Sequence, residues 1–312
     1  MNRARIAVIV PCFNEEAAIS KVVSDFRASL PEAVIHVYDN LSSDRTAEVA
    51  KAAGAVVHTV VRRGKGNVVR RMFADVEADI YVLVDGDDTY DAAVAPDMIA
   101  RLVQNGLDIV SGKREATGSE SYRFGHVVGN RLLTGLTSLI FRLRVQDMLT
   151  GYRVMSRRFV KSFPFTAEGF GIETELTVHA VRLLMPMAEV PTRYKERPSG
   201  SVSKLNTWRD GFRILFTIVG LVREELPLVF YATIGFLFGI AALAIGIPVV
   251  LEYFRTGLVP RLPTAVLVTG MMVLAALSVM SGIILDTVTR GRWEQKRMAY
   301  LAIPGPQDLH FP

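Results

Sequence analysis

The stretch VLVDGDDTYD, residues 82–91, joins an apolar run to four carboxylates that fall within seven positions. The apolar residues 82–84 predict the end of a buried strand. The carboxylates that follow are Asp85, Asp87, Asp88 and Asp91. Like charges this close together repel one another and cost stability unless a positive group lies among them. We therefore expect a cationic partner at the end of this strand.

Short β-branched strands alternate with amphipathic helices around this stretch. Strands are predicted at 6–10, 34–38, 56–61, 80–84 and 108–111, and helices at 15–30, 42–53, 67–76 and 94–104, the second beginning at a Ser42 or Ser43 cap. This alternation favours an α/β fold with a Rossmann-like, mostly parallel sheet. Ligands of such sheets bind outside the carboxyl ends of the strands. Charged clusters at 14–16, 39–40 and 85–91 therefore predict a binding site along one edge of the sheet.

Beyond Gly112 the alternation ends. Helices are predicted at 124–141 and 170–184, a short strand at 188–191 and a basic loop at 193–204. Residues 207–223 place Arg209 and Arg213 on one helical side among aromatic and aliphatic residues, which favours a helix in the membrane interface. The alternative for this segment is a helix packed on the domain.

Two runs without a charged side chain follow, of 26 residues (226–251) and 24 residues (262–285). A helix of roughly 20 apolar residues crosses a bilayer, so both runs predict membrane spans. The alternative is a buried pair of core helices. Basic residues flank the pair on its outer sides, and by the positive-inside rule the large flanks lie in the cytoplasm. Gly235 and Gly239 have the spacing of a close helix contact.

The chain carries a net charge of +5 and one cysteine, Cys12. Its basic residues crowd near the predicted spans, which indicates attraction to anionic lipid rather than to nucleic acid. A single cysteine excludes an intrachain disulfide and suits a reducing compartment. Small residues in the spans permit a homo-oligomer. The predicted parts are an α/β domain at 1–205, an interfacial helix at 206–225, two spans at 226–288 and a cytoplasmic tail at 289–312.

The acid-x-acid element Asp85-Gly86-Asp87 predicts a divalent metal site. Mg²⁺ is typically held by one or two carboxylates together with the phosphates of a ligand. The expected cation is then Mg²⁺ or Mn²⁺ carrying a phosphorylated ligand, and the alternative is a solvated turn. Asp88 is interpreted as a residue of a solvated turn and Asp91 as a helix N-cap, neither as a metal ligand.

The segment Arg62-Arg63-Gly64-Lys65-Gly66-Asn67 opens the third predicted helix. Small residues at this point let backbone N–H groups approach an anion, and Lys65 adds a positive charge. The segment matches neither a Walker A loop nor a G-x-G-x-x-G fingerprint. An exposed basic turn is the alternative.

Taken jointly, these motifs resemble a known family. PCFNEE (11–16), DNLSSD (39–44), RGKG (63–66) and DGD (85–87) stand in the order of the family 2 glycosyltransferases of the GT-A fold. GKR (112–114), GNR (129–131), D-x-x-TGYR (147–153), the helix around Glu175 and R-x-x-GSVSKL (197–205) narrow the resemblance. With the two-span hairpin, the chain is similar to the polyprenyl-phosphate glycosyltransferases, the dolichol-phosphate-mannose synthase and GtrB-like group.

The resemblance implies roles for individual residues. The nucleotide-sugar site would comprise Pro11, Asn14, Glu15, Asp39, Lys65, Asp85 and Asp87, with Asp87 and Asp85 as metal ligands. The lipid phosphate and the closing loop would involve Arg114, Arg131, Arg197, Ser201, Ser203 and Lys204. The catalytic set would be Asp87, Lys65, Arg114, Arg131, Asp147 and Glu175. Two departures are expected to loosen binding: Thr89 stands where relatives often have Gln, and Asn40 where many have Asp.

The implied reaction is the metal-dependent, inverting transfer of a sugar from a nucleoside diphosphate to a polyprenyl phosphate, undecaprenyl or dolichyl. A UDP-hexose is the favoured donor and GDP-mannose the second option. A phosphate monoester with a second pKa of about 6 is largely dianionic at neutral pH, so no general base is expected. The alternatives are transfer to a glycolipid or polysaccharide hydroxyl, for which the Q-x-x-R-W motif is not found, and a non-catalytic membrane scaffold.

Overall fold

The computed structural model describes residues 4–116, 146–164, 171–195, 216, 219–220 and 222–308. The chain divides into two compact units, Met1–Leu215 with Gln295–Pro312, and Phe216–Glu294. The predicted helix at 124–141, most of the predicted interfacial helix and five predicted site residues lie outside the described residues. These five are Arg131, Arg197, Ser201, Ser203 and Lys204. The four-part division of the chain remains a prediction.

A seven-stranded sheet forms the centre of the first unit. Its strands are β1 (Ile6–Cys12), β2 (Val34–Asp39), β3 (Val56–Thr59), β4 (Ile80–Leu83), β5 (Ile109–Ala116), β6 (Arg153–Ser156) and β7 (Met187–Tyr194). They are ordered β3-β2-β1-β4-β6-β5-β7, with only β6 antiparallel to its neighbours within this sheet. This confirms the predicted mostly parallel α/β fold. β6 was not predicted, because four residues that begin with an arginine carry no strand periodicity.

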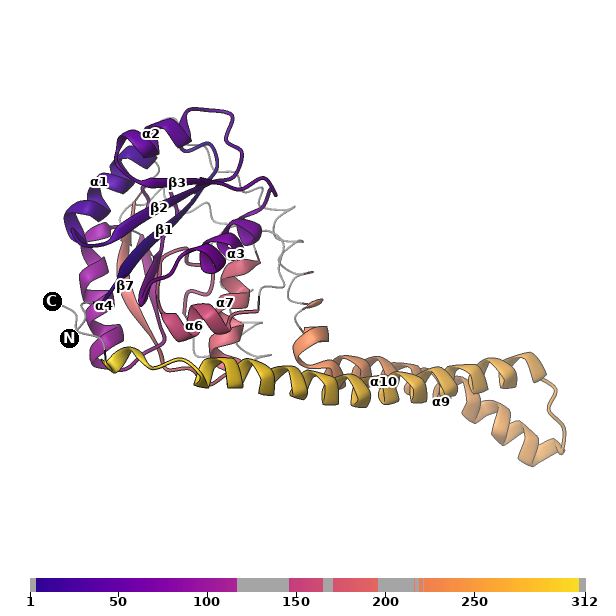
Figure 1. Ribbon diagram of the computed structural model, residues 1–312. Helices are drawn as coiled ribbons and strands as arrows, with labels where there is room; N and C mark the ends of the chain where they lie inside the picture. Colours follow the sequence, from indigo (N-terminus) through magenta and orange to yellow (C-terminus); the bar gives the residue numbers. More distant parts are fainter. Residues whose placement is uncertain are drawn as a thin grey trace. The chain divides into compact units, whose positions relative to one another are not determined.

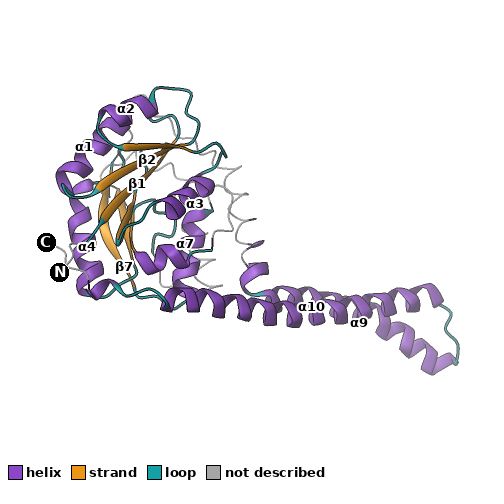
Figure 2. Cartoon of the chain, in the orientation of Figure 1, coloured by secondary structure: helices purple, strands orange, loops and turns teal. Residues whose placement is uncertain are grey.

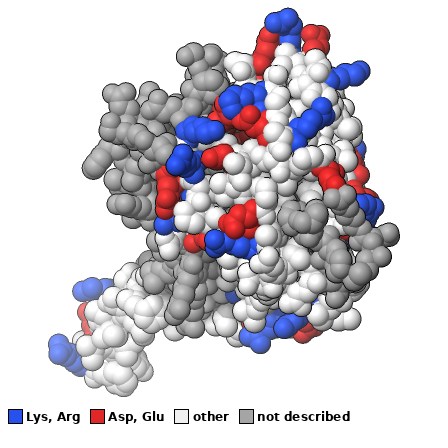
Figure 3. All heavy atoms as spheres, turned by 90° about the vertical axis from the view of Figure 1, so that its left-hand side faces the viewer, with Lys and Arg blue, Asp and Glu red and all other residues white. Residues whose placement is uncertain are grey.

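Helices cover both faces of the sheet (Figures 1 and 2). One core cluster joins the sheet to α1 (Ile19–Ser29), α2 (Thr46–Ala52) and α4 (Ala95–Gln104). A second cluster joins the opposite face to α3 (Lys65–Asp75), α6 (Arg157–Ser162) and α7 (Ile172–Arg182). On the surface drawn in Figure 3, Lys and Arg side chains are interspersed with Asp and Glu, in keeping with the modest net charge.

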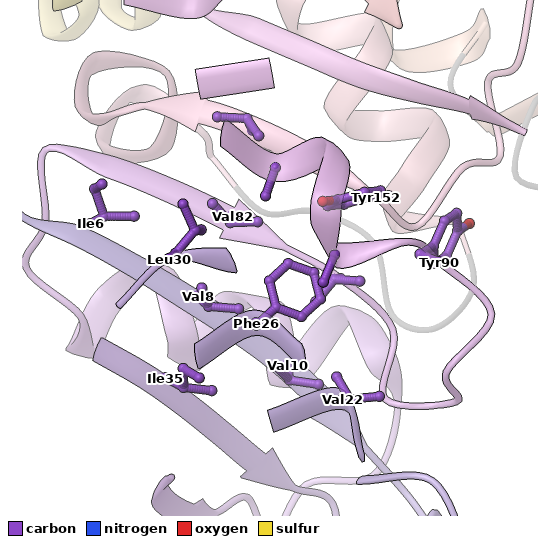
Figure 4. Packing of buried hydrophobic residues seen from close by; sticks show 14 of the residues in the cluster. Ile6, Val8, Val10, Val22, Phe26, Leu30, Ile35, Val82, Tyr90 and Tyr152 are labelled. Atoms are coloured by element: carbon purple, nitrogen blue, oxygen red, sulfur yellow. The ribbon is translucent and has the colours of Figure 1, made fainter. Parts of the chain in front are cut away.

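The first cluster shows how the hydrophobic pattern becomes a core (Figure 4). Val8 and Val10 of β1 are fully buried, and Phe26 of α1 is 2% exposed. The ring of Phe26 meets that of Tyr152 edge to face, with centroids 5.9 Å apart. Burying one such side chain stabilises the fold by about 1.5–3 kcal/mol. The packing fixes the strands on which the charged loops are carried.

Several predicted boundaries are wrong by a few residues. The first helix begins at Ile19 rather than Glu15, and the third begins at Lys65 rather than Asn67. The second begins at Thr46, and neither Ser42 nor Ser43 caps it. The fifth strand continues beyond Ser111 to Ala116, and the last extends over Met187–Tyr194. The predicted role of Asp91 is confirmed, because its side chain accepts a hydrogen bond from the Ala93 N–H at 3.1 Å, before η1 (Ala92–Val94).

The second unit contains α9 (Pro227–Thr256) and most of α10 (Leu262–Leu301), which form a hairpin. Both helices are long and apolar enough to cross a membrane, and each contains an 18-residue stretch of high mean hydropathy, 2.6 in α9 and 2.2 in α10. A Cβ on Gly235 would lie 2.8 Å from the carbonyl oxygen of Ala275, so glycine is needed for this close approach. Gly239 has open space around it, so only one glycine of the predicted pair makes a close contact.

The last residues of α10 belong to the first unit, where Tyr300 joins a buried charge cluster. Asp108, at the amino end of β5, has no exposed surface. It accepts hydrogen bonds from Ser156 Oγ at 2.7 Å and Tyr300 Oη at 2.8 Å. Arg158 donates two more, from Nε at 2.5 Å and Nη2 at 2.9 Å. Four donors around two carboxylate oxygens leave this cluster saturated.

Candidate active site

Backbone strain marks the carboxyl ends of three adjacent strands. Asn14, Leu41 and Asp88 have φ angles of 54°, 58° and 55° and follow β1, β2 and β4. This left-handed conformation costs an L-residue roughly 1–2 kcal/mol. Strained residues of this kind concentrate at binding and catalytic sites. Their position agrees with the edge at which the sequence predicts a ligand.

Lysines provide positive charge among the four carboxylates. Lys65 Nζ lies 2.5 Å from Asp85 Oδ1, and Lys21 Nζ lies 3.5 Å from Asp88 Oδ1. The prediction that Asp88 is simply solvated is therefore wrong, since it is partly buried and paired. The provisional assignment of the cation to a metal alone is also incomplete, because Asp85 already has Lys65 as a partner.

A second carboxylate, Glu173, completes the surroundings of Lys65. Glu173 Oε1 lies 2.6 Å from Lys65 Nζ, and both side chains are largely buried. Burial alone would lower the pKa of Lys65, but the charges and hydrogen bonds of Asp85 and Glu173 outweigh it and raise the pKa above its ordinary value. The lysine is thus held as an ammonium ion.

Glu175 was predicted as a site residue, whereas its neighbour Glu173 was not. Both glutamates lie in the first turn of α7, and each is 7% exposed. Two positions on a helix turn by about 200°, so two such side chains leave the helix on different sides. Glu173 is the one that reaches Lys65. The only signal in the sequence was the pair itself, GIETE, which does not indicate which glutamate faces the lysine.

Asp87 is the predicted metal ligand of the acid-x-acid element. It is 4% exposed, and its Oδ1 accepts the Thr89 hydroxyl at 2.6 Å. Thr89 thus contacts the predicted metal ligand directly, and its effect on metal affinity stays a prediction. Within the described ranges no three His, Cys, Asp or Glu side chains form a metal cluster. One or two carboxylates suffice for Mg²⁺ when phosphates supply other ligands, so the residues fit a phosphate-bound ion.

Asp39 offers an unpaired acceptor to a ligand. It is 6% exposed, and its Oδ2 accepts the Ser42 N–H at 3.2 Å. Its Oδ1 is buried and has no hydrogen-bond partner in the part of the chain that the structure describes. A buried acceptor without a donor costs about 1–3 kcal/mol. An N–H or O–H group of a ligand would satisfy it.

The other predicted nucleoside-site residues lie at the same place. Cys12 and Asp39 are register partners of β1 and β2, so Pro11 lies one position from this pair. Asn14 Oδ1 accepts the Ser43 N–H at 2.8 Å, which ties the loops after the two strands together. The Glu15 N–H donates to the Thr46 hydroxyl at 2.8 Å. The structure therefore brings Pro11, Asn14, Glu15 and Asp39 to one end of β1 and β2.

Asn40 builds the loop that leads to Lys65. Its Nδ2 donates to the carbonyl oxygens of Val60 and Arg62, each at 2.9 Å, and its Oδ1 accepts the Gly64 N–H at 2.8 Å. Gly64 has φ 118°, which favours glycine. A carboxylate at position 40 could not donate either bond. The asparagine that the resemblance marks as a departure is therefore the residue this loop requires.

Arg114 and Asp147 form a bidentate ion pair. Arg114 Nε and Nη2 donate to the two oxygens of Asp147 at 2.7 and 2.8 Å. Burial would raise the pKa of Asp147, but the hydrogen bonds and charge of Arg114 lower it below its usual range. The guanidinium also lies 5.5 Å from the ring centroid of Tyr194. Two predicted catalytic residues thus act as one unit.

Gly151 allows Asp85 its position. A Cβ on Gly151 would lie 2.1 Å from Asp85 Oδ2, closer than any side chain permits. The Gly151 N–H donates to the Tyr90 hydroxyl at 2.9 Å. The glycine of the TGYR motif is therefore required by direct contact with a site carboxylate.

Comparison with known proteins now identifies the family. Residues 7–163 match the model of glycosyl transferase family 2. The chain belongs to this family. It is 31% identical over 298 residues to the glycosyltransferase AglJ of Haloferax volcanii, covering 94% of this chain and 96% of the relative. It is 32% identical over 221 residues to a dolichyl-phosphate hexose transferase of the same organism, covering 70% and 95%.

A solved structure extends the family assignment to the fold. The glucosyl-3-phosphoglycerate synthase of Mycobacterium tuberculosis, in complex with Mn²⁺, UDP and phosphoglyceric acid, aligns with a TM-score of 0.55 and 25% identity. The alignment covers 70% of this chain and 78% of that one. The protein is a glycosyltransferase with a GT-A-like domain followed by two long apolar helices, as the resemblance implied.

Proposed function

We propose that this glycosyltransferase moves a hexose from a nucleoside diphosphate to a polyprenyl phosphate, with inversion and with Mg²⁺ or Mn²⁺. The observation that carries the proposal is the pairing of Lys65 with Asp85 beside Asp87 at the strained edge of the sheet. The relative named as a dolichyl-phosphate hexose transferase supports the acceptor class. The Mn²⁺ and UDP of the mycobacterial complex support the metal and favour UDP over GDP.

The donor half of the site has a group for each part of a nucleoside diphosphate. Asp39 Oδ1 would accept a hydrogen bond from the base or ribose. Lys65 would donate to the diphosphate, and Asp87 would hold the metal, with Asp85 beside it. When bound, such an ion neutralises charge on phosphate oxygens. The ammonium of Lys65 stabilises the same charge as it develops on the leaving group.

The acceptor half needs orientation more than proton transfer. A polyprenyl phosphate is largely dianionic at neutral pH, as phosphoserine is with a second pKa of about 6. Its oxygen can attack without a general base, so alignment by cations would supply most of the help. Among the residues that the structure describes, Arg114 is the candidate for this role, and its ion pair with Asp147 holds it in place. Arg131, Arg197, Ser201, Ser203 and Lys204 would line the remaining phosphate and loop contacts, and Glu175 would support positioning.

The apolar hairpin would keep the enzyme beside its lipid. A polyprenyl tail does not leave the bilayer readily, because each buried CH₂ contributes about 0.8 kcal/mol. Helices α9 and α10 would span the membrane, and the basic flanks would place the catalytic unit on the cytoplasmic face. The protein would therefore act at the membrane surface.

The test is nucleotide release by the full chain, purified in detergent with Mn²⁺ or Mg²⁺. UDP- and GDP-sugars are compared with and without polyprenyl phosphate, and Asp87→Ala is the inactive control. Release that depends on the lipid phosphate and disappears in the variant supports the proposal and identifies the donor. Nucleotide release that is equal with and without the lipid phosphate favours the alternative, a transferase acting on a glycolipid or polysaccharide hydroxyl. No release with any donor would leave the scaffold interpretation.

A further inference from the structure

We propose that Glu173 is a positioning residue for the transfer, one that acts through Lys65 and holds its ammonium against the leaving diphosphate. This inference rests on the proposed function, in which Lys65 faces that diphosphate. Glu173 itself need not touch the substrate.

The first argument is the geometry around the ammonium. An ammonium has three N–H donors. Two of them meet carboxylates, Asp85 Oδ1 at 2.5 Å and Glu173 Oε1 at 2.6 Å. These are the contacts of Lys65 that the structure describes, so one donor remains for a phosphate oxygen. A lysine side chain carries about 2 kcal/mol of rotamer entropy, and a second partner removes freedom that Asp85 alone would leave.

The second argument is that Glu173 is itself held in place. Arg153 is 1% exposed, and its Nη2 donates to the carbonyl oxygen of Glu173 at 3.0 Å. The same guanidinium donates to the carbonyl oxygens of Met148 at 2.8 Å and Thr150 at 3.2 Å. The first turn of α7 is thereby fixed to the segment 148–153, which also contains Gly151.

These contacts close a ring. Gly151 touches Asp85, Asp85 pairs with Lys65, Lys65 pairs with Glu173, and Glu173 is bonded to Arg153 two residues after Gly151. The link to Arg153 runs through the backbone carbonyl oxygen of Glu173, so a shift of α7 or of the segment 148–153 would disturb the contact with Lys65. Misplacing a catalytic group by about 1 Å can cost roughly 100-fold in rate, so such a ring has a clear use.

The third argument concerns charge. A second carboxylate beside Lys65 repels an incoming diphosphate, so its negative charge lowers the affinity for the donor. An interaction that helps the reaction without helping ground-state binding must act on the transition state. Glu173 should therefore raise kcat. Its negative charge should leave nucleotide binding unchanged or weaken it.

The experiment uses the full-length protein in detergent and compares Glu173→Gln, Lys65→Met and the double variant. In Glu173→Gln we expect kcat to fall about 10-fold, with the Kd of UDP, by calorimetry, equal or lower. In the Lys65→Met background, Glu173→Gln should alter kcat by less than about 2-fold, because the lysine through which Glu173 acts is no longer present. Glu77→Gln is the matched control, since Glu77 pairs with Lys161 at 2.7 Å but is 52% exposed.

The outcomes separate this inference from the proposed function. If Lys65→Met leaves both UDP binding and activity intact, the proposed donor site is wrong. If Lys65→Met loses most of its activity but Glu173→Gln keeps its kcat, only the role of Glu173 is overturned. Equal losses from Glu173→Gln in both backgrounds, together with a lower melting temperature, would show a structural role and would also overturn it.

Discussion

Asp108 and Asp85 lie at opposite edges of the same sheet and differ in how their surroundings are completed. Asp108, before β5, is fully buried and surrounded by four donors from Ser156, Arg158 and Tyr300. Asp85, after β4, shares one lysine, Lys65, with Glu173. At the same edge of the sheet, Asp39 Oδ1 has no hydrogen-bond partner among the described residues. The saturated edge stabilises the fold, whereas the unsaturated edge retains groups for a ligand.

The difference also has an energetic side. Strain at Asn14, Leu41 and Asp88 and an unpaired buried oxygen destabilise the carboxyl edge. At the amino edge the carboxylate of Asp108 is fully paired, and its bond from Tyr300 fastens the C-terminal residues to the catalytic unit. Changes at the two edges should therefore separate activity from stability.

The largest effect is expected from Gly151→Ala at the carboxyl edge. The new Cβ would overlap Asp85 Oδ2 and displace the carboxylate together with Lys65. Activity should fall at least about 100-fold, because a small displacement of a catalytic group has effects of this size. Nucleotide release measures it, and Gly239→Ala is the control, since that position has open space. Wild-type activity in Gly151→Ala would show that Asp85 need not stay where it is.

Asp108→Asn should break the amino edge instead. The substitution leaves Arg158, 18% exposed at its side chain, without its carboxylate. Removing one member of a buried ion pair costs about 3 kcal/mol or more. The melting temperature should drop, while the specific activity of folded protein at low temperature stays near the wild-type value. Loss of activity without loss of stability would contradict the assignment of this edge.

Asn40→Asp tests the loop before Lys65. The carboxylate cannot donate to the carbonyl oxygens of Val60 and Arg62, so the loop should loosen. We expect the KM for the donor to rise about 10-fold, the equivalent of one lost hydrogen bond. Asn105→Asp makes the same change at an exposed helix end, where the side chain bonds only its own helix, and should leave the KM unaltered. An unchanged KM in both variants would show that the loop held by Asn40 does not contribute to donor binding.

The smallest effect is expected from Tyr300→Phe. It removes one of the four hydrogen bonds to Asp108 and should lower the free energy of unfolding by about 1 kcal/mol. Thermal denaturation in detergent measures the change. Specific activity should be retained, and a catalytic defect in this variant would place Tyr300 in the working site.

The sequence alone determined the local features of the protein. Alternating periodicities predicted the α/β sheet, since strands and helices differ in the spacing of their apolar residues. The position of Asp85 and Asp87 after an apolar run placed the site at the carboxyl edge, because parallel strands end together. The two uncharged runs predicted α9 and α10, because their composition and length leave few other structures.

Only the tertiary structure decided which side chains meet. It inserted β6, paired Lys65 with Glu173, paired Arg114 with Asp147, and gave Asn40 its three loop contacts. Each of these joins residues 20 or more positions apart in the chain or depends on strand pairing. Local periodicity fixes the direction of a side chain relative to its own helix or strand. Its partner depends on how separate elements pack, and no short stretch of sequence contains that information.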